Sequence, residues 1–190
     1  MRGLVPRDVI DAFIRGGARL LQIRQKSGDA EGFVSLVRDA ITIGRPRGAR
    51  VIVNDRADIA ALTGADGVHV GQTDLSVADV RRIGGTGLMI GLSTHTTAQV
   101  DEALADGVSY VAVGPVFRTA TKDTGYDARG LELVRYAAAG GAPVVAIGGI
   151  TLERAAAVVA AGATSVAVIS DLVASGDAER RVRAYVDALG

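Results

Sequence analysis

The chain contains no cysteine, which excludes a disulfide framework, a zinc site built on thiolates and a cysteine nucleophile. With only two histidines in 190 residues, a metal site made of histidines alone is not expected. The 21 basic side chains balance the 21 acidic ones, which argues against nucleic-acid binding through a basic surface. No apolar run reaches the roughly 18 residues of a membrane span, and the N-terminus lacks the apolar segment of a secretory signal. We therefore expect one compact cytoplasmic domain over residues 1–190.

Aromatic residues are scarce at 4% while apolar residues make up 48%, so the core must be built from valine, isoleucine, leucine and alanine. In parallel strands that are covered on both faces, such residues form continuous apolar runs. Seven runs of this kind are present: Arg19–Ile23, Arg50–Val53, Gly67–Val70, Leu88–Leu92, Tyr110–Val113, Pro143–Ile147 and Ser165–Ile169. Segments with helical apolar spacing precede, separate or follow them: Asp8–Ile14, Glu31–Ile43, Thr97–Ala105, Leu152–Ala161 and Arg180–Leu189. This alternation predicts βαβ units and a parallel sheet.

Two parallel architectures fit that alternation, an open doubly wound sheet and a closed barrel. The open sheet is disfavoured because no G-x-G-x-x-G turn follows the first predicted strand. All seven strands end in polar residues, as expected for a barrel whose strand ends converge on one active face. Four strands are also preceded by small-residue turns containing glycine, which can end a helix in the left-handed conformation. We predict the α/β class and a TIM-type (β/α)₈ barrel that lacks its first strand, because the segment before Asp8 is too short and too interrupted to supply one.

Polar side chains at the first three strand ends indicate an anion site and a cation site. On the first strand, Gln22, Arg24 and Lys26 alternate along one side, a combination suited to a phosphate or diphosphate. An ordinary charged strand end is the alternative. Asp55 and Asp74 follow the next two strands, and two carboxylates at neighbouring strand ends can hold Mg²⁺ together with substrate phosphates. Each aspartate has the alternative role of a helix N-cap.

The later strand ends offer further candidates. Ser93 can donate to a phosphate or cap the following helix, and we expect packing or loop roles for His69 and His95. The segment 114–130 is long for a connection inside a compact domain, which is typical of a functional loop. The glycine pair 148–149 precedes a helix, an arrangement common at barrel phosphate sites, with backbone turning as its alternative role.

Taken in series, the strand-end motifs resemble those of the thiamine-phosphate synthase family. The motifs are LQIRQK, VND, GVHVGQTD, GLSTHT, VGPVFRTATK, VAIGGI and VAVIS, and the resemblance runs from about Gly16 to about Asp171. Members of that family are barrels that join an aminomethylpyrimidine diphosphate to a thiazole phosphate carboxylate and release diphosphate. The resemblance thus implies two small-molecule substrates and Mg²⁺, with no nucleic acid or membrane partner, and it leaves a homo-oligomer open.

The resemblance also implies a role for individual positions. The pyrimidine diphosphate would be held by Gln22, Ile23, Arg24, Gln25, Lys26, Asn54, Ser93 and Lys122. Among these, the catalytic group that stabilises the departing anion would be Arg24, Lys26, Ser93 and Lys122. Mg²⁺ would bind Asp55 and Asp74. The thiazole phosphate would be received by Thr119, Ala120, Thr121, Gly149, Ile169 and Ser170.

Some features depart from the family pattern and keep alternatives open. Besides the missing strand, Arg118 stands where many relatives have proline, and the insert 123–129 replaces a shorter loop. The thiazole tautomerase branch of the superfamily is the nearest alternative, but it commonly has a histidine where this chain has Pro115. The second alternative is a non-catalytic remnant of such an enzyme that binds phosphate ligands without turnover. A Schiff-base aldolase is disfavoured because Lys26 and Lys122 follow strand ends instead of lying in apolar strand interiors.

Overall fold

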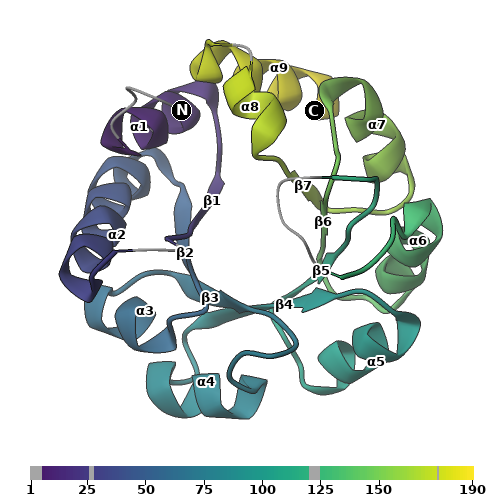
Figure 1. Cartoon of the computed structure of the whole chain (residues 1–190), viewed down its shortest axis with the longest axis horizontal. Coiled ribbons are helices and arrows are strands. Elements are labelled where there is room, and N and C mark those ends of the chain that lie inside the picture. The colour runs from purple at the N-terminus through teal and green to yellow at the C-terminus, as the bar shows by residue number, and fades with distance from the viewer. Residues whose placement is uncertain (1–5, 26–27, 120–124, 175) are drawn as a thin grey trace.

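The computed structural model describes residues 6–25, 28–119, 125–174 and 176–190. Seven parallel strands form one sheet in sequence order, curled around a central axis with the helices outside (Figure 1). The strands are β1 (Leu20–Ile23), β2 (Arg50–Asn54), β3 (Gly67–Val70), β4 (Met89–Thr94), β5 (Tyr110–Val113), β6 (Val144–Ile147) and β7 (Ser165–Ala167). Within the described residues no ladder joins β7 back to β1, so the barrel wall is open between them. The prediction of a TIM-type barrel with seven strands is confirmed.

The helices connect successive strands and cover the outer face of the sheet (Figure 1). They are α1 (Pro6–Gly16), α2 (Ala30–Gly44), the short 3₁₀ helix η1 (Arg45–Arg47), α3 (Ala57–Thr63), α4 (Val77–Gly84), α5 (Thr97–Ala105), α6 (Gly130–Ala139), α7 (Leu152–Ala160), α8 (Ser170–Ala174) and α9 (Ala178–Leu189). In the part of the chain that the structure describes, no helix combines the length and apolarity needed to cross a membrane.

The main core lies between the strands and the surrounding helices. Its centre consists of valines with no exposed surface, such as Val51 on β2 and Val37 on α2. β3 and β5 are buried along their whole length, as expected when a parallel strand is covered on both faces. Burying a valine side chain stabilises a fold by about 1.5–3 kcal/mol, so this layer supplies most of the driving force for folding.

Four helix-to-strand turns contain the glycines that the sequence predicts. Gly17, Gly64, Gly107 and Gly162 have φ angles of 105°, 67°, 65° and 105°, in the left-handed region that L side chains rarely adopt. At the end of α3, for example, the N–H of Gly64 donates to the helix carbonyls of Ala60 and Ala61. The glycines therefore end the helices and return the chain to the sheet.

Two strands end two residues away from their predicted ends, and β1, β2 and β6 differ from their predicted bounds by one residue each. β4 continues to Thr94, which is fully buried, pairs with Val113 and accepts a hydrogen bond from the N–H of Gly114. In contrast, β7 ends at Ala167, and Ile169 beyond it is 51% exposed. The reason is tertiary: β4 has a neighbouring strand on each side, whereas β7 is paired on one side only.

Inside the barrel lies a smaller second cluster, formed by Tyr110, Ala112 and Val145 with Met89 and Ala167 packed against it. The Tyr110 ring passes directly over the backbone of β4 at Gly91, where any Cβ atom would overlap the ring. Gly91 therefore gives this aromatic side chain its place in the barrel interior.

Candidate active site

The candidate residues gather at one rim of the barrel, because all seven strands run in the same direction and end on the same side. Gln22 lies on β1, Asn54 ends β2 and Ser93 lies on β4. The connections that follow the strands carry Arg24, Gln25, Asp55, Asp74, Thr119, Gly149 and Ile169, and Ser170 begins α8. Lys26, Ala120, Thr121 and Lys122 lie outside the described residues.

The side chains of β1 alternate between the barrel interior and the helix layer. Leu21 and Ile23 are buried in the main core, whereas Gln22 and Arg24 are exposed on the other side of the strand. Ile23 was predicted to contact substrate, but its side chain packs in the core, so its backbone alone could serve that role. The expected alternation of Gln22 and Arg24 toward one side is present.

Asp55 and Asp74 follow the adjacent strands β2 and β3. The N–H of Asp55 donates to the carbonyl of His69 on β3 at 2.8 Å, and Asp55 has a φ angle of 63°, in the left-handed region. The Oδ2 atom of Asp74 accepts from the N–H of Gly71 at 2.7 Å, which closes the turn after β3. The alternative N-cap roles are wrong, because the N-caps are Arg56 for α3 and Ser76 for α4.

Asp55 directly follows Asn54, which is buried at the end of β2, and Asp74 lies in the turn after the neighbouring strand β3. Within the described ranges no group of three or more histidine, cysteine, aspartate or glutamate side chains could hold a metal ion. A site of carboxylate and amide oxygens fits a hard divalent cation that takes its remaining ligands from a bound phosphate and water. The donor set therefore fits Mg²⁺ in the presence of a phosphorylated substrate.

Ser93 lies inside β4 and faces a histidine on the neighbouring strand. Its Oγ atom is 2.8 Å from Nε2 of His69, and its carbonyl accepts from Nε2 of Gln72 at 2.7 Å. Nδ1 of His69 is 3.0 Å from the hydroxyl of Tyr110, whose ring stacks on the imidazole at a centroid distance of 5.7 Å. The cap role for Ser93 is wrong, because the side chain of Thr96 caps α5. His69 is buried as expected, but its two polar contacts were not foreseen.

The connection after β5 is fastened to the turn after β6. The N–H groups of Val116 and Phe117 donate to the carbonyls of Ile147 and Gly148, each at 2.9 Å. A Cβ atom on Gly149, whose φ angle is 63°, would lie 2.5 Å from the carbonyl oxygen of Arg118. This glycine therefore permits a close approach of two backbones in addition to a turn. Through this contact, the segment that carries Thr119 lies against the glycine pair.

Stacked side chains anchor the end of the β5–α6 connection that lies next to α6. The Tyr126 ring stacks on the His95 ring at a centroid distance of 4.2 Å. The Arg129 guanidinium lies over the Tyr126 ring, 4.9 Å from the ring centroid. The Tyr126 hydroxyl accepts from Nε2 of Gln99 at 3.3 Å, and Nδ1 of His95 bonds to the carbonyl of Gly114. His95 thus has the loop-anchoring role expected of it.

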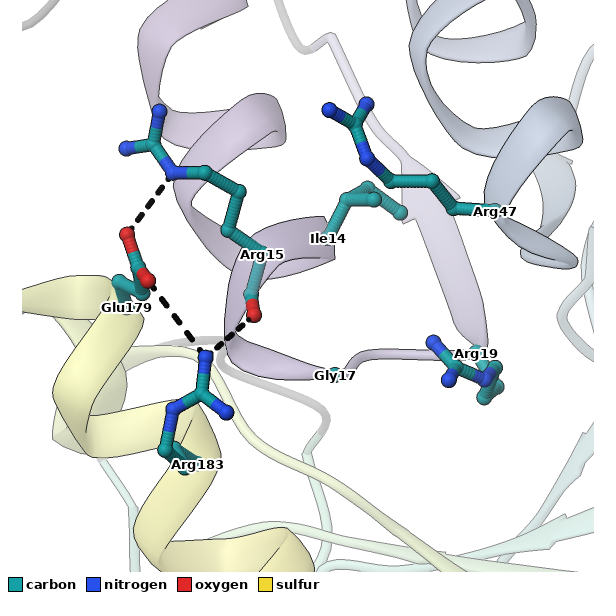
Figure 2. Close-up of a pocket in the computed structure, with 7 residues that line it drawn as sticks. All are labelled: Ile14, Arg15, Gly17, Arg19, Arg47, Glu179 and Arg183. Carbon is teal, nitrogen blue, oxygen red and sulfur yellow. Dashed lines mark hydrogen bonds and ion pairs between the residues drawn. The ribbon is translucent and has the colours of Figure 1, made fainter.

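A pocket of about 630 Å³ lies between α1, α9 and the turn that leads into β1 (Figure 2). It is lined by Ile14, Arg15, Gly17, Arg19, Arg47, Glu179 and Arg183. Gly17 and Arg19 precede β1, which places the pocket at the amino ends of the strands. Nε of Arg15 donates to Glu179 at 2.8 Å, and Arg183 donates to the carbonyl of Arg15 at 2.7 Å, so these two cations hold α9 against α1. This pocket is separate from the rim.

Comparison with known proteins gives a consistent result. Residues 6–172 match the family described as thiamine monophosphate synthase. A thiamine-phosphate synthase of Roseiflexus castenholzii is 42% identical over 95% of this chain and 79% of its own length. The corresponding protein of Chlorobium luteolum is 40% identical over 95% of this chain and 86% of its own. A solved structure of thiamine phosphate pyrophosphorylase from Pyrococcus furiosus superposes with a TM-score of 0.90 at 28% identity, covering 96% of this chain and 88% of the other.

Proposed function

The chain belongs to the thiamine monophosphate synthase family, and from that premise we propose that it is a transferase with thiamine-phosphate synthase activity. It would join 4-amino-2-methyl-5-(diphosphooxymethyl)pyrimidine to carboxythiazole phosphate and release diphosphate. The bond between the pyrimidine methylene carbon and the diphosphate oxygen breaks, and a bond forms from that carbon to the thiazole nitrogen. The thiazole carboxylate leaves as carbon dioxide, and its bonding electron pair stays on the ring carbon of the thiazole. The observation that carries the proposal is the convergence of the family's strand-end motifs on one rim.

The half of the rim formed by β1 to β4 suits the diphosphate. Arg24 supplies a permanent positive charge that can bind phosphate oxygens in a bidentate manner, and Gln22, Asn54 and Ser93 supply neutral hydrogen bonds. Asp55 and Asp74 would hold Mg²⁺, which when bound would neutralise negative charge on the departing diphosphate. The half formed by β5 to β7 would receive the thiazole phosphate through Thr119, Gly149 and Ser170.

This chemistry requires no nucleophilic side chain. Loss of diphosphate leaves a stabilised cation on the pyrimidine methylene carbon, and the second substrate supplies the nucleophile. The protein contributes preorganised charge around the leaving group and holds the two substrates in line. Removing one such electrostatic donor typically lowers the rate by about 10²–10³.

The test is diphosphate release by the purified protein, measured with both substrates, with each substrate alone and with Mg²⁺ chelated. We expect release only when both substrates and Mg²⁺ are present. Arg24→Ala should lower the rate by about 10²–10³, whereas the matched change Arg38→Ala, at an exposed site on α2, should leave it within about twofold. Isomerisation of the thiazole without coupling, or binding without release, would overturn the proposal.

A further inference from the structure

A row of polar side chains crosses the barrel interior from β1 to β4. The Gln22 side chain hydrogen-bonds to the hydroxyl of Tyr110. That hydroxyl lies 3.0 Å from Nδ1 of His69, and Nε2 of His69 lies 2.8 Å from Oγ of Ser93. Tyr110 and His69 are 5% and 8% exposed, so bulk water does not compete for the bond between them, whereas Ser93 is partly exposed and Gln22 is exposed. The row joins two residues of the proposed diphosphate site through two that have no assigned role.

The position of one proton decides what this row can do. A neutral imidazole carries its hydrogen on one nitrogen, so it donates at one end and accepts at the other. If Nε2 carries the hydrogen, Ser93 accepts from His69 and its own O–H remains available to donate. If Nδ1 carries it, the serine hydroxyl must donate to His69 and no longer has a hydrogen for a ligand.

The surroundings favour the first arrangement. Burial raises the pKa of Tyr110, so its phenol keeps its hydrogen and can donate to Nδ1. The Gln22 side chain is hydrogen-bonded to the same phenol, and an amide N–H can donate to the phenol oxygen while the phenol O–H donates to Nδ1. Gln72 holds the carbonyl of Ser93 at 2.7 Å, which fixes the backbone that carries the hydroxyl. Donation can then run in one direction, from Gln22 through Tyr110 and His69 to Ser93.

We propose that His69 is a positioning residue for the reaction: as the Nε2–H tautomer it donates to Ser93 and thereby directs the serine hydroxyl toward the diphosphate. This inference rests on the proposed function, because the diphosphate is the anion that Ser93 would meet at the rim. Tyr110 sets the tautomer by donating to Nδ1, and the stacked ring keeps the imidazole in place. His69 itself does not touch the substrate.

The tautomer can be measured without any substrate. The chain contains two histidines, so ¹⁵N spectra of histidine-labelled protein are simple, and the spectrum of His95→Gln assigns the signals of His69. We expect the hydrogen of His69 on Nε2 and an unprotonated Nδ1. Tyr110→Phe, which keeps the ring and removes the donor, should lower the Nε2–H fraction. A hydrogen on Nδ1 in the wild-type protein would overturn the proposal.

A double-mutant cycle tests whether His69 acts through Ser93. His69→Leu should lower kcat/KM for diphosphate release about 10-fold, the usual effect of one well-placed hydrogen bond. In the Ser93→Ala background the same change should have an effect of less than about threefold, because its target has gone. Equal losses in both backgrounds would show that His69 serves structure alone and would overturn the proposal.

Two conservative variants keep the test decisive where His69→Leu folds poorly. In His69→Gln the amide nitrogen replaces Nε2 and should recover kcat/KM to within about threefold of wild type. In His69→Asn the side chain reaches only toward Tyr110, so the loss should match that of His69→Leu. Glutamine that rescues no better than asparagine would contradict the proposal. Wild-type protein that releases no diphosphate would defeat the proposed function instead, and the tautomer measurement would still decide the position of the proton.

Discussion

Replacing Asp74 with asparagine removes one of the two carboxylates at the rim while preserving the local turn. The Oδ2 atom of Asp74 accepts from the N–H of Gly71 at 2.7 Å, and an asparagine oxygen can accept the same hydrogen bond. Asp74 is exposed and is not the N-cap of α4, so the substitution leaves no buried group unsatisfied. The free energy of unfolding should therefore change by no more than about 1 kcal/mol.

Activity should respond far more strongly than stability. An amide oxygen can still coordinate a divalent cation, but it lacks the negative charge of the carboxylate and binds the cation more weakly. Removing residues that only support metal ligands already lowers metal affinity by about 10- to 100-fold. We therefore expect the Mg²⁺ concentration for half-maximal rate to rise by at least that factor. At limiting Mg²⁺, the rate of diphosphate release should fall by about 10²–10³.

The assay is a Mg²⁺ titration of diphosphate release with both substrates saturating, accompanied by a thermal melt of each protein. Asp187→Asn is the matched control, because it makes the same chemical change at an exposed position on α9. Its Mg²⁺ requirement should equal that of the wild-type protein. An unchanged Mg²⁺ requirement in Asp74→Asn would refute the assignment of this carboxylate as a metal ligand.

Three further changes test the fold. Gly91→Ala should lower the free energy of unfolding by about 1–3 kcal/mol in denaturant titrations, because its Cβ would overlap the Tyr110 ring. Asp171→Asn should cost about 1–3 kcal/mol by the same measurement, since this carboxylate accepts two bonds from Arg181 and one from Tyr185; an unchanged midpoint would contradict that account. Arg56 holds the pKa of Asp58 below its usual value, so this pair stabilises the fold above the ordinary aspartate pKa, and the contribution is lost as pH falls through the lowered folded pKa. In Asp58→Asn, the free energy of unfolding should therefore fall less steeply at acidic pH than in the wild-type protein. An unchanged fall would show that the Arg56–Asp58 pair does not stabilise the fold.

The strands and their order follow from local sequence patterns. β3, β5 and α5 have the predicted bounds, because their apolar runs are interrupted at both ends by glycine, polar residues or proline. The predicted end of β4 falls two residues too early, since Ser93 and Thr94 are polar and were interpreted as part of a loop. Their place in the sheet depends on pairing with β5, a contact between segments far apart in the sequence.

The sequence was sufficient to predict which residues of the described chain reach the rim, but not which of their side chains contact one another. Strand direction alone brings Gln22, Asn54 and Ser93 to one rim, so the order of the motifs was sufficient for that step. The partners of His69 come from two other strands, and which side chains meet across a barrel interior depends on strand register and tilt. The approach of Gly149 to Arg118 is likewise set by the packing of two loops.

The most direct measurement of the central claim is a crystal structure with Mg²⁺ and diphosphate bound. We expect diphosphate at the carboxyl rim, with Arg24 and Ser93 on its oxygens and the cation shared with Asp55 and Asp74. Diphosphate bound instead among Arg19, Arg47 and Arg183, in the pocket at the amino ends of the strands (Figure 2), would contradict the account.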